Sequence, residues 1–274
     1  MNFTATDLHW SSASRTDVGM VRKLNEDSVL DLPELGLWAV ADGMGGHSAG
    51  DFASAAIVTA LSAIPRPSSL DALSSEVRRR LQTVNRRLHD EAIARREQVI
   101  GSTVVALLAD ANHASVLWAG DSRAYLYRDG KLLQLSRDHS QVEELMSRGL
   151  LTPEQAEGHP ASNVITRAVG VVDTVEVDSE TLAIAEDDIF LLCSDGLYRE
   201  LDDDAIKACL LSGDCRRACD ELVNAALAQG ARDNVSVVVV RIADGTQVTR
   251  TQYNPSVKPV TRSGPDPDDP TDVC

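Results

Sequence analysis

The sequence predicts an α+β protein, in which antiparallel strands and helices pack around a common core. Residues 101–138 contain four short strand-like runs separated by turn signals, a pattern typical of an antiparallel meander. Apolar residues with helical spacing recur as one pair of helices within 52–96 and a second pair within 202–229. This combination of strand-rich stretches with paired helices is the basis for the predicted fold class.

Length and composition narrow the class of protein. With 274 residues, 43% of them hydrophobic, the chain can bury a substantial core in one large domain or two small ones. Its net charge of −16 argues against a nucleic-acid partner, because such partners are bound through Lys and Arg. No apolar run approaches the roughly 18 residues of a membrane span, and Met1–Trp10 lacks the features of a signal peptide. We therefore expect a cytoplasmic protein that does not bind membranes.

The N-terminal part is expected to form two strands, with two short strand-like runs on either side of Glu26 and Asp27 between them, followed by two helices. Residues 8–14 alternate weakly, as in an edge strand. Residues 35–41 form an apolar strand that breaks at Asp42, where three of the next four residues are glycine. Apolar positions with helical spacing then predict helices over 52–64 and 70–96.

The remaining elements are expected in the following order. The strands of the meander are 103–108, 114–119, 124–127 and 131–135. Residues 139–170, with short helical pieces and a polar break, are interpreted as an inserted flap. Later strands are expected at 175–184, 189–193 and 235–240, and helices at 202–211 and 215–229. The strand 235–240 is apolar enough to be central, whereas the Pro-rich acidic tail, 244–274, is expected to be disordered.

Acidic residues recur where apolar strands end. Asp42, Asp121, Asp195 and Asp233 each stand where a strand meets Gly, Ser or Asn, and Glu26 and Asp27 stand beside another short strand. A single Asp-Gly is more often a turn than a ligand, but the repetition favours a shared site. Burying several carboxylates together is unfavourable unless cations neutralise them. Oxygen ligands without His or Cys at ligand spacing favour Mg²⁺ or Mn²⁺ over Zn²⁺.

A series of motifs resembles a known enzyme family. The motifs are Arg22 to Asp27, Val40 to Gly46, Gly101 to Thr103, Ala119 to Arg123, Cys193 to Leu197 and Arg232 to Ser236. In this order they resemble the metal-dependent serine/threonine protein phosphatases of type 2C, in their bacterial form. The resemblance covers about residues 11–243 and implies a sandwich of two antiparallel sheets flanked by helices on both outer faces. It makes residues 1–243 one catalytic domain, with the flap inserted at 139–170.

The resemblance also implies roles for individual residues. Asp42 would bridge two metal ions, with Glu26 and the Gly43 carbonyl on one ion and two further aspartates on the other. Those two aspartates are Asp195 and Asp233. Asp121, together with Asp195, would bind a third and weaker ion. Asp27 would orient metal-bound water, and Arg22 would hold the phosphate oxygens of the substrate through its planar guanidinium.

The implied chemistry uses a metal-activated water. Two cations lower the pKa of a bridging water and neutralise charge during an in-line displacement at phosphorus, so no phosphoenzyme is expected. Eukaryotic members carry a His directly after the Asp-Gly, which has been proposed as the general acid, and here this position is Met44. Either metal-bound water or His47 then donates the proton. Since a His near a helix start is more often neutral and structural, we favour water.

The expected function is hydrolysis of phosphoserine and phosphothreonine in proteins with Mn²⁺ or Mg²⁺, opposing a bacterial serine/threonine kinase. One alternative is a stress-regulator phosphatase that acts on a single anti-sigma antagonist. Another is a catalytically inactive scaffold that binds phosphoproteins, although every expected carboxylate is present. A metal-dependent nuclease fits the carboxylates but neither the charge nor the motif order. Phosphorylated proteins, including a kinase and its targets, are the expected partners, and the chain is expected to be a monomer.

Overall fold

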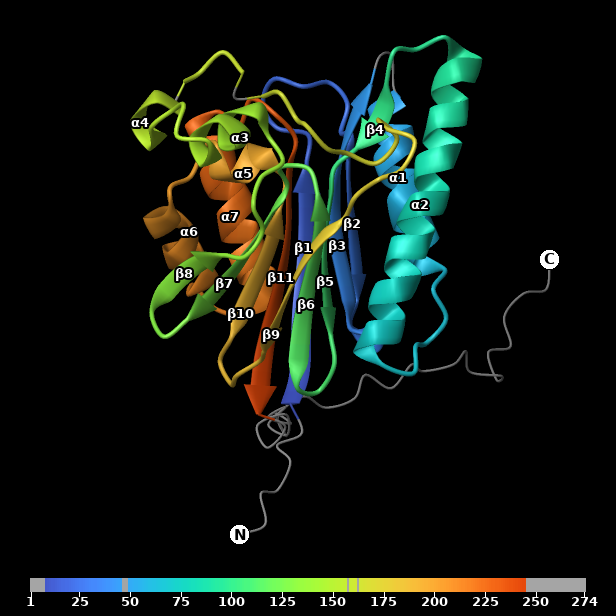
Figure 1. Cartoon of the computed structure of the whole chain (residues 1–274). Coiled ribbons are helices and arrows are strands. Elements are labelled where there is room, and N and C mark those ends of the chain that lie inside the picture. The colour runs from blue at the N-terminus through green and yellow to red at the C-terminus, as the bar shows by residue number, and fades with distance from the viewer. Residues whose placement is uncertain (1–7, 46–48, 157, 162, 245–274) are drawn as a thin grey trace, which may run out of the picture.

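Two antiparallel sheets lie face to face, and helices cover the outer side of each sheet (Figure 1). The computed structural model describes residues 8–45, 49–156, 158–161 and 163–244. The α+β class and the sandwich with helices on both outer faces are confirmed. Within these ranges no helix has both the length and the apolar character that crossing a membrane requires.

The first sheet has the strand order β1-β11-β10-β7-β8. Its strands are β1 (Leu8–Asp17), β7 (Arg123–Arg128), β8 (Lys131–Gln134), β10 (Ile189–Cys193) and β11 (Val235–Asp244). β1 is an edge strand, as its weak alternation predicts. β11 pairs with strands on both sides and its Val237–Val240 run is fully buried, which confirms that this strand is central.

The second sheet has the order β2-β3-β5-β6-β9, and a short strand, β4, pairs with the end of β3. Its strands are β2 (Asp27–Leu32), β3 (Leu37–Gly45), β4 (Ile100–Ser102), β5 (Val104–Ala109), β6 (His113–Ala119) and β9 (Asp178–Ala183). A 3₁₀ turn, Pro33–Leu35, joins β2 to β3.

The helices form separate groups on the two sides of the sandwich (Figure 1). Their bounds are α1 (Ala49–Ser62), α2 (Leu70–Arg95), α3 (Gln141–Ser147), α4 (Pro153–Ala156), α5 (Asp195–Tyr198), α6 (Asp203–Leu210) and α7 (Cys215–Gln229). Side-chain caps mark where four of them begin, since Ser69, Ser140, Asp202 and Asp214 each accept a hydrogen bond from a first-turn N–H. Gly230 caps the C-terminus of α7, and its φ of 107° is in the left-handed region that such a cap favours.

Three buried clusters hold these layers together. One joins the second sheet to Ile57 of α1 and Leu81 of α2, and another joins the first sheet to Leu222 of α7. The third lies between the sheets and contains the fully buried Trp38 and Phe190. Tight packing on both faces makes the two sheets a rigid frame for side chains at their ends.

The prediction of one continuous meander over 101–138 is wrong. β5 and β6 belong to the second sheet, whereas β7 and β8 belong to the first. The chain changes sheets at Gly120–Ser122, where Gly120 has φ of 123° and a Cβ would lie 2.6 Å from the Thr103 Cβ. This crossing places Asp121 between the two sheets.

Two other element predictions are corrected, and one element was missed. The strand expected to end before Asp42 continues to Gly45, because β4 pairs with its last residues. The strand expected at 175–184 begins only at Asp178. The single helical turn α5 is not predicted at all. The tail after Asp244 and His47 lie outside the described residues, and the domain boundaries stay predictions.

Candidate metal centre

Five of the six predicted acidic residues meet in one pocket at the end of the sandwich, and the exception is Asp27, which does not line it. The pocket has a volume of about 280 Å³, and its lining includes Glu26, Asp42, Gly43, Asp121, Asp195 and Asp233. Arg22, Met44, Asn163, Arg199 and Asn234 complete most of its wall. Strand ends from both sheets therefore converge, which their separation along the sequence does not reveal.

Asp42 lines the pocket, and Asp27 lies next to it on the neighbouring strand. The two residues are directly paired across β2 and β3, and Asp27 is 8% exposed. Ser194 Oγ donates a 2.8 Å hydrogen bond to one Asp27 oxygen. Burial raises the pKa of Asp27 to about 7, and burial followed by repulsion from Asp27 raises the pKa of Asp42 well above its usual value.

The glycine after Asp42 is required by a close approach of the protein backbone. A Cβ on Gly43 would lie 2.0 Å from the carbonyl oxygen of Gly50 in α1. The close approach at Gly43 is thus made by this helix. A Cβ on Gly50 would in turn lie 2.4 Å from Glu26 Oε1, so the two glycines allow Glu26 to reach the pocket. Burial raises the pKa of the Glu26 carboxyl.

Arg22 lies at the rim, opposite Asp233. Its Nη2 donates a 2.8 Å hydrogen bond to Asp233 Oδ2, and half of the Arg22 side chain is exposed. The guanidinium therefore combines a partner in the pocket with access to solvent, as a residue that receives substrate phosphate needs.

Asn234 is a site residue that the sequence interpretation missed. Its side-chain NH₂ donates to the carbonyls of Val18 and Leu24, and its Oδ1 accepts from the N–H of Glu26. Asn234 thereby holds the loop that carries Arg22 and Glu26 against the start of β11. Its place in the Arg232 to Ser236 motif was the available signal.

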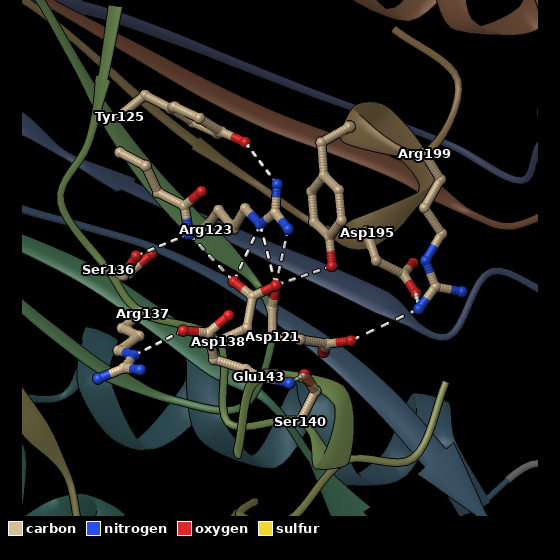
Figure 2. A network of polar contacts seen from close by, with 12 residues as sticks. Asp121, Arg123, Tyr125, Ser136, Arg137, Asp138, Ser140, Glu143, Asp195 and Arg199 are labelled. Carbon is tan, nitrogen blue, oxygen red and sulfur yellow. Dashed lines mark hydrogen bonds and ion pairs between the residues drawn. The ribbon is translucent and has the colours of Figure 1, made fainter. Parts of the chain in front are cut away.

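Asp121 and Asp195 form a second acidic pair beside Arg199. Arg199 Nη2 lies 2.9 Å from Asp195 Oδ2 and 3.6 Å from Asp121 Oδ2. Figure 2 shows the guanidinium directed at both carboxylates. Burial, followed by repulsion from Asp195, raises the pKa of Asp121 to about 7, and burial also raises the pKa of Asp195.

A network of polar contacts lies beside this acidic pair (Figure 2). Arg123 donates to both oxygens of Asp138, at 2.9 and 2.7 Å, and its guanidinium lies 3.6 Å from the centre of the Tyr198 ring. Tyr198 donates a 3.0 Å hydrogen bond to the carbonyl of Asp121. Asp138 directly precedes residues 139–170, so this network links the base of the flap to Asp121. The sequence patterns assigned no role to Arg123, Asp138 or Tyr198.

The donor set fits hard divalent cations. Among the described residues, Asp27 Oδ1, Asp121 Oδ1 and Asp195 Oδ1 are buried without a hydrogen-bond partner. Such oxygens are unfavourable unless a cation compensates them. In the same part of the chain no three His, Cys, Asp or Glu side chains already stand as a metal-binding group. Two of the expected carboxylate ligands are instead paired with arginines, Asp233 with Arg22 and Asp195 with Arg199.

Comparison with known proteins identifies the class of protein. Residues 22–237 match the family described as Protein phosphatase 2C. This match covers well over half of the chain, which therefore belongs to the protein phosphatase 2C family.

Individual relatives are bacterial proteins. The chain is 36% identical to the serine/threonine protein phosphatase PstP of Mycobacterium tuberculosis over 239 residues, which are 85% of this chain and 45% of PstP. It thus spans about half the length of that relative. It is also 34% identical to the serine/threonine phosphatase stp of Listeria welshimeri, over 82% of this chain and 93% of that protein.

Solved structures agree with this assignment. PppA from Pseudomonas aeruginosa, described as a key regulatory component of T6SS, is 48% identical, with a TM-score of 0.80 over 85% of this chain and 98% of PppA. The PstP catalytic domain in complex with two manganese ions is 34% identical, with a TM-score of 0.76 over 86% of this chain and all of that one.

Proposed function

We propose that this chain is a serine/threonine protein phosphatase that hydrolyses phosphoserine and phosphothreonine in proteins with the help of two Mn²⁺ or Mg²⁺ ions. The observation that carries the proposal is the pocket itself, in which carboxylates of raised pKa face one another beside an accessible guanidinium. Family membership and the two manganese ions of the PstP domain support it.

The chain's own residues divide into ligands and positioning groups. Asp42 would hold both ions, and Glu26 and the Gly43 carbonyl would help to hold one of them. Asp195 and Asp233 would help to hold the other ion. Bound divalent ions supply a water of lowered pKa and neutralise charge on the phosphate during in-line displacement. Asp27, which pairs with Asp42 across β2 and β3, would orient this water through its free oxygen.

Arg22 binds the substrate phosphate in this proposal. Asp233 accepts a hydrogen bond from the Arg22 guanidinium, and its use as a metal ligand would weaken this ion pair or exchange it for a metal bond. The exchange would leave Arg22 with its donors directed at the same pocket, where a phosphate dianion can accept two parallel hydrogen bonds. Metal binding and substrate binding would thus be linked through Asp233.

The flap provides the proposed substrate groove. A second pocket, of about 560 Å³, adjoins the first and shares Asp121, Asn163 and Arg199 with it. Flap residues including Val142, Glu143 and Met146 line its other side. We infer that the peptide around the phosphorylated residue lies here, so that 139–170 governs substrate choice rather than chemistry.

Phosphoproteins, including a serine/threonine kinase and its targets, are the proposed partners, in the cytoplasm and with the chain acting as a monomer. An inactive scaffold is not favoured, because none of the expected carboxylates is missing. Action on a single regulatory antagonist has no specific support in the site.

The test is phosphate release from a phosphothreonine peptide and from nitrophenyl phosphate, each with Mn²⁺ and with chelator. We expect both substrates to be hydrolysed only with metal. Exchange of residues 139–170 for those of a relative should change peptide preference and leave nitrophenyl phosphate hydrolysis nearly intact. Loss of both activities together would make the flap catalytic or structural.

A further inference from the structure

Local helical geometry places Arg199 beside the acidic pair of Asp121 and Asp195. Arg199 directly follows the helical turn α5, and its backbone N–H donates to the carbonyl of Asp195. Residues four apart in a helical turn lie on the same face, so the Arg199 side chain lies over the Asp195 carboxylate. Arg199 and Asp195, a proposed metal ligand, therefore belong to the same short segment.

The Arg199 guanidinium also reaches Asp121, which lies where the chain passes from the second sheet to the first. Nη2 lies between Asp195 Oδ2, at 2.9 Å, and Asp121 Oδ2, at 3.6 Å (Figure 2). The side chain is about one-third exposed, whereas Asp121 is 3% exposed. A single positive charge thus bridges two buried carboxylates that would otherwise repel each other.

We propose that Arg199 is a built-in cation that takes the place of a third divalent ion between Asp121 and Asp195. The inference rests on the proposed function, in which Asp195 also serves the main pair of ions. Like charges a few ångströms apart repel even in water, so a divalent ion between these carboxylates must displace the guanidinium or bind weakly beside it.

This arrangement has a chemical consequence. A permanent guanidinium offsets one of the two negative charges of Asp121 and Asp195 at any physiological metal concentration, because arginine does not lose its proton. Arg199 also lines both the metal pocket and the flap groove. Its charge therefore acts both on the metal centre and on a peptide bound in the groove. The chain then saturates with two tightly bound ions.

The test is calorimetric titration of the full chain with Mn²⁺ alone. Arg199→Gln removes the charge, and we expect it to bind a third Mn²⁺ at least about tenfold more tightly than the wild type does. Arg199→Lys keeps the charge and should resemble the wild type. Arg137→Gln is the matched control, because Arg137 pairs with Glu143 on the flap and not with the acidic pair. Melting temperatures establish that each variant is folded.

The outcomes separate the inference from the proposed function. Unchanged affinity for a third Mn²⁺ in Arg199→Gln overturns the inference, as does equal tightening in Arg137→Gln, since net charge rather than position would then be responsible. In both cases two tightly bound Mn²⁺ ions and phosphate release leave the proposed function standing. A wild-type chain that binds no Mn²⁺ and releases no phosphate contradicts both.

Discussion

Replacing Asp27 with Asn should make the metal-free protein more stable while impairing its activity. Asp27 is buried in the strand that pairs with Asp42, and one of its oxygens has no hydrogen-bond partner among the described residues. The amide removes the charge, and its oxygen can still accept the hydrogen bond from Ser194. The substitution therefore changes electrostatics with little change in shape.

The magnitude follows from the raised pKa. Burial moves the pKa of Asp27 from 3.8 to about 7. Between these values the folded, metal-free protein holds a proton that the unfolded chain has lost, so the free energy of unfolding falls as pH rises. Above pH 7 the full difference of about 3 units corresponds to at most about 4 kcal/mol. Because neighbouring carboxylates share the charge, we expect Asp27→Asn to gain about 1–4 kcal/mol at pH 8.

Urea unfolding in chelator at pH 5 and pH 8 measures this gain. We expect the variant to exceed the wild type clearly at pH 8 and less at pH 5, and to hydrolyse nitrophenyl phosphate more slowly with Mn²⁺. Asp90→Asn, on the exposed face of α2, is the control for loss of a surface charge. Equal stability at pH 8, or a gain that does not depend on pH, would refute the reasoning.

Three further substitutions test separate parts of the structure. Arg22→Ala should raise KM for a phosphopeptide about tenfold or more with metal binding intact, and an unchanged KM would count against it. Asp121→Ala should keep the two tight ions yet lose roughly 10- to 100-fold in kcat, whereas wild-type kcat would leave Asp121 as a plain turn residue. Arg128→Met should destabilise the fold by about 2 kcal/mol in urea unfolding, because it leaves the buried Asp188 carboxylate without its guanidinium partner. Wild-type stability would show that water replaces the arginine.

Local patterns in the sequence predicted most elements of the fold, because helical spacing and apolar runs reflect burial directly. The helices α1, α2 and α7 begin and end within a few residues of their predicted limits, and β11 is central as its valines indicate. The assignment of strands to sheets failed at Gly120, since a turn within one sheet and a crossing between two sheets have the same local signals.

For the site, as for the fold, the sequence predicted only part of what the structure shows. The motifs identified the acidic residues that line the pocket, but they did not reveal the groups that hold those residues in place. Asn234, Tyr198 and Arg199 act through contacts across more than 70 residues of sequence or through an unpredicted helical turn. Such contacts depend on which sheet each strand joins, and the spacing of residues along the sequence does not indicate which sheet that is.

The most direct test is phosphate release from a phosphothreonine peptide measured while Mn²⁺ is titrated into the metal-free wild type, with bound metal counted in the same samples. We expect no turnover until the second Mn²⁺ binds, full turnover at two ions per chain, and none in Asp42→Ala at any Mn²⁺ concentration. Full turnover in chelator, or in Asp42→Ala, would contradict the proposal that Asp42 joins two metal ions in the reaction.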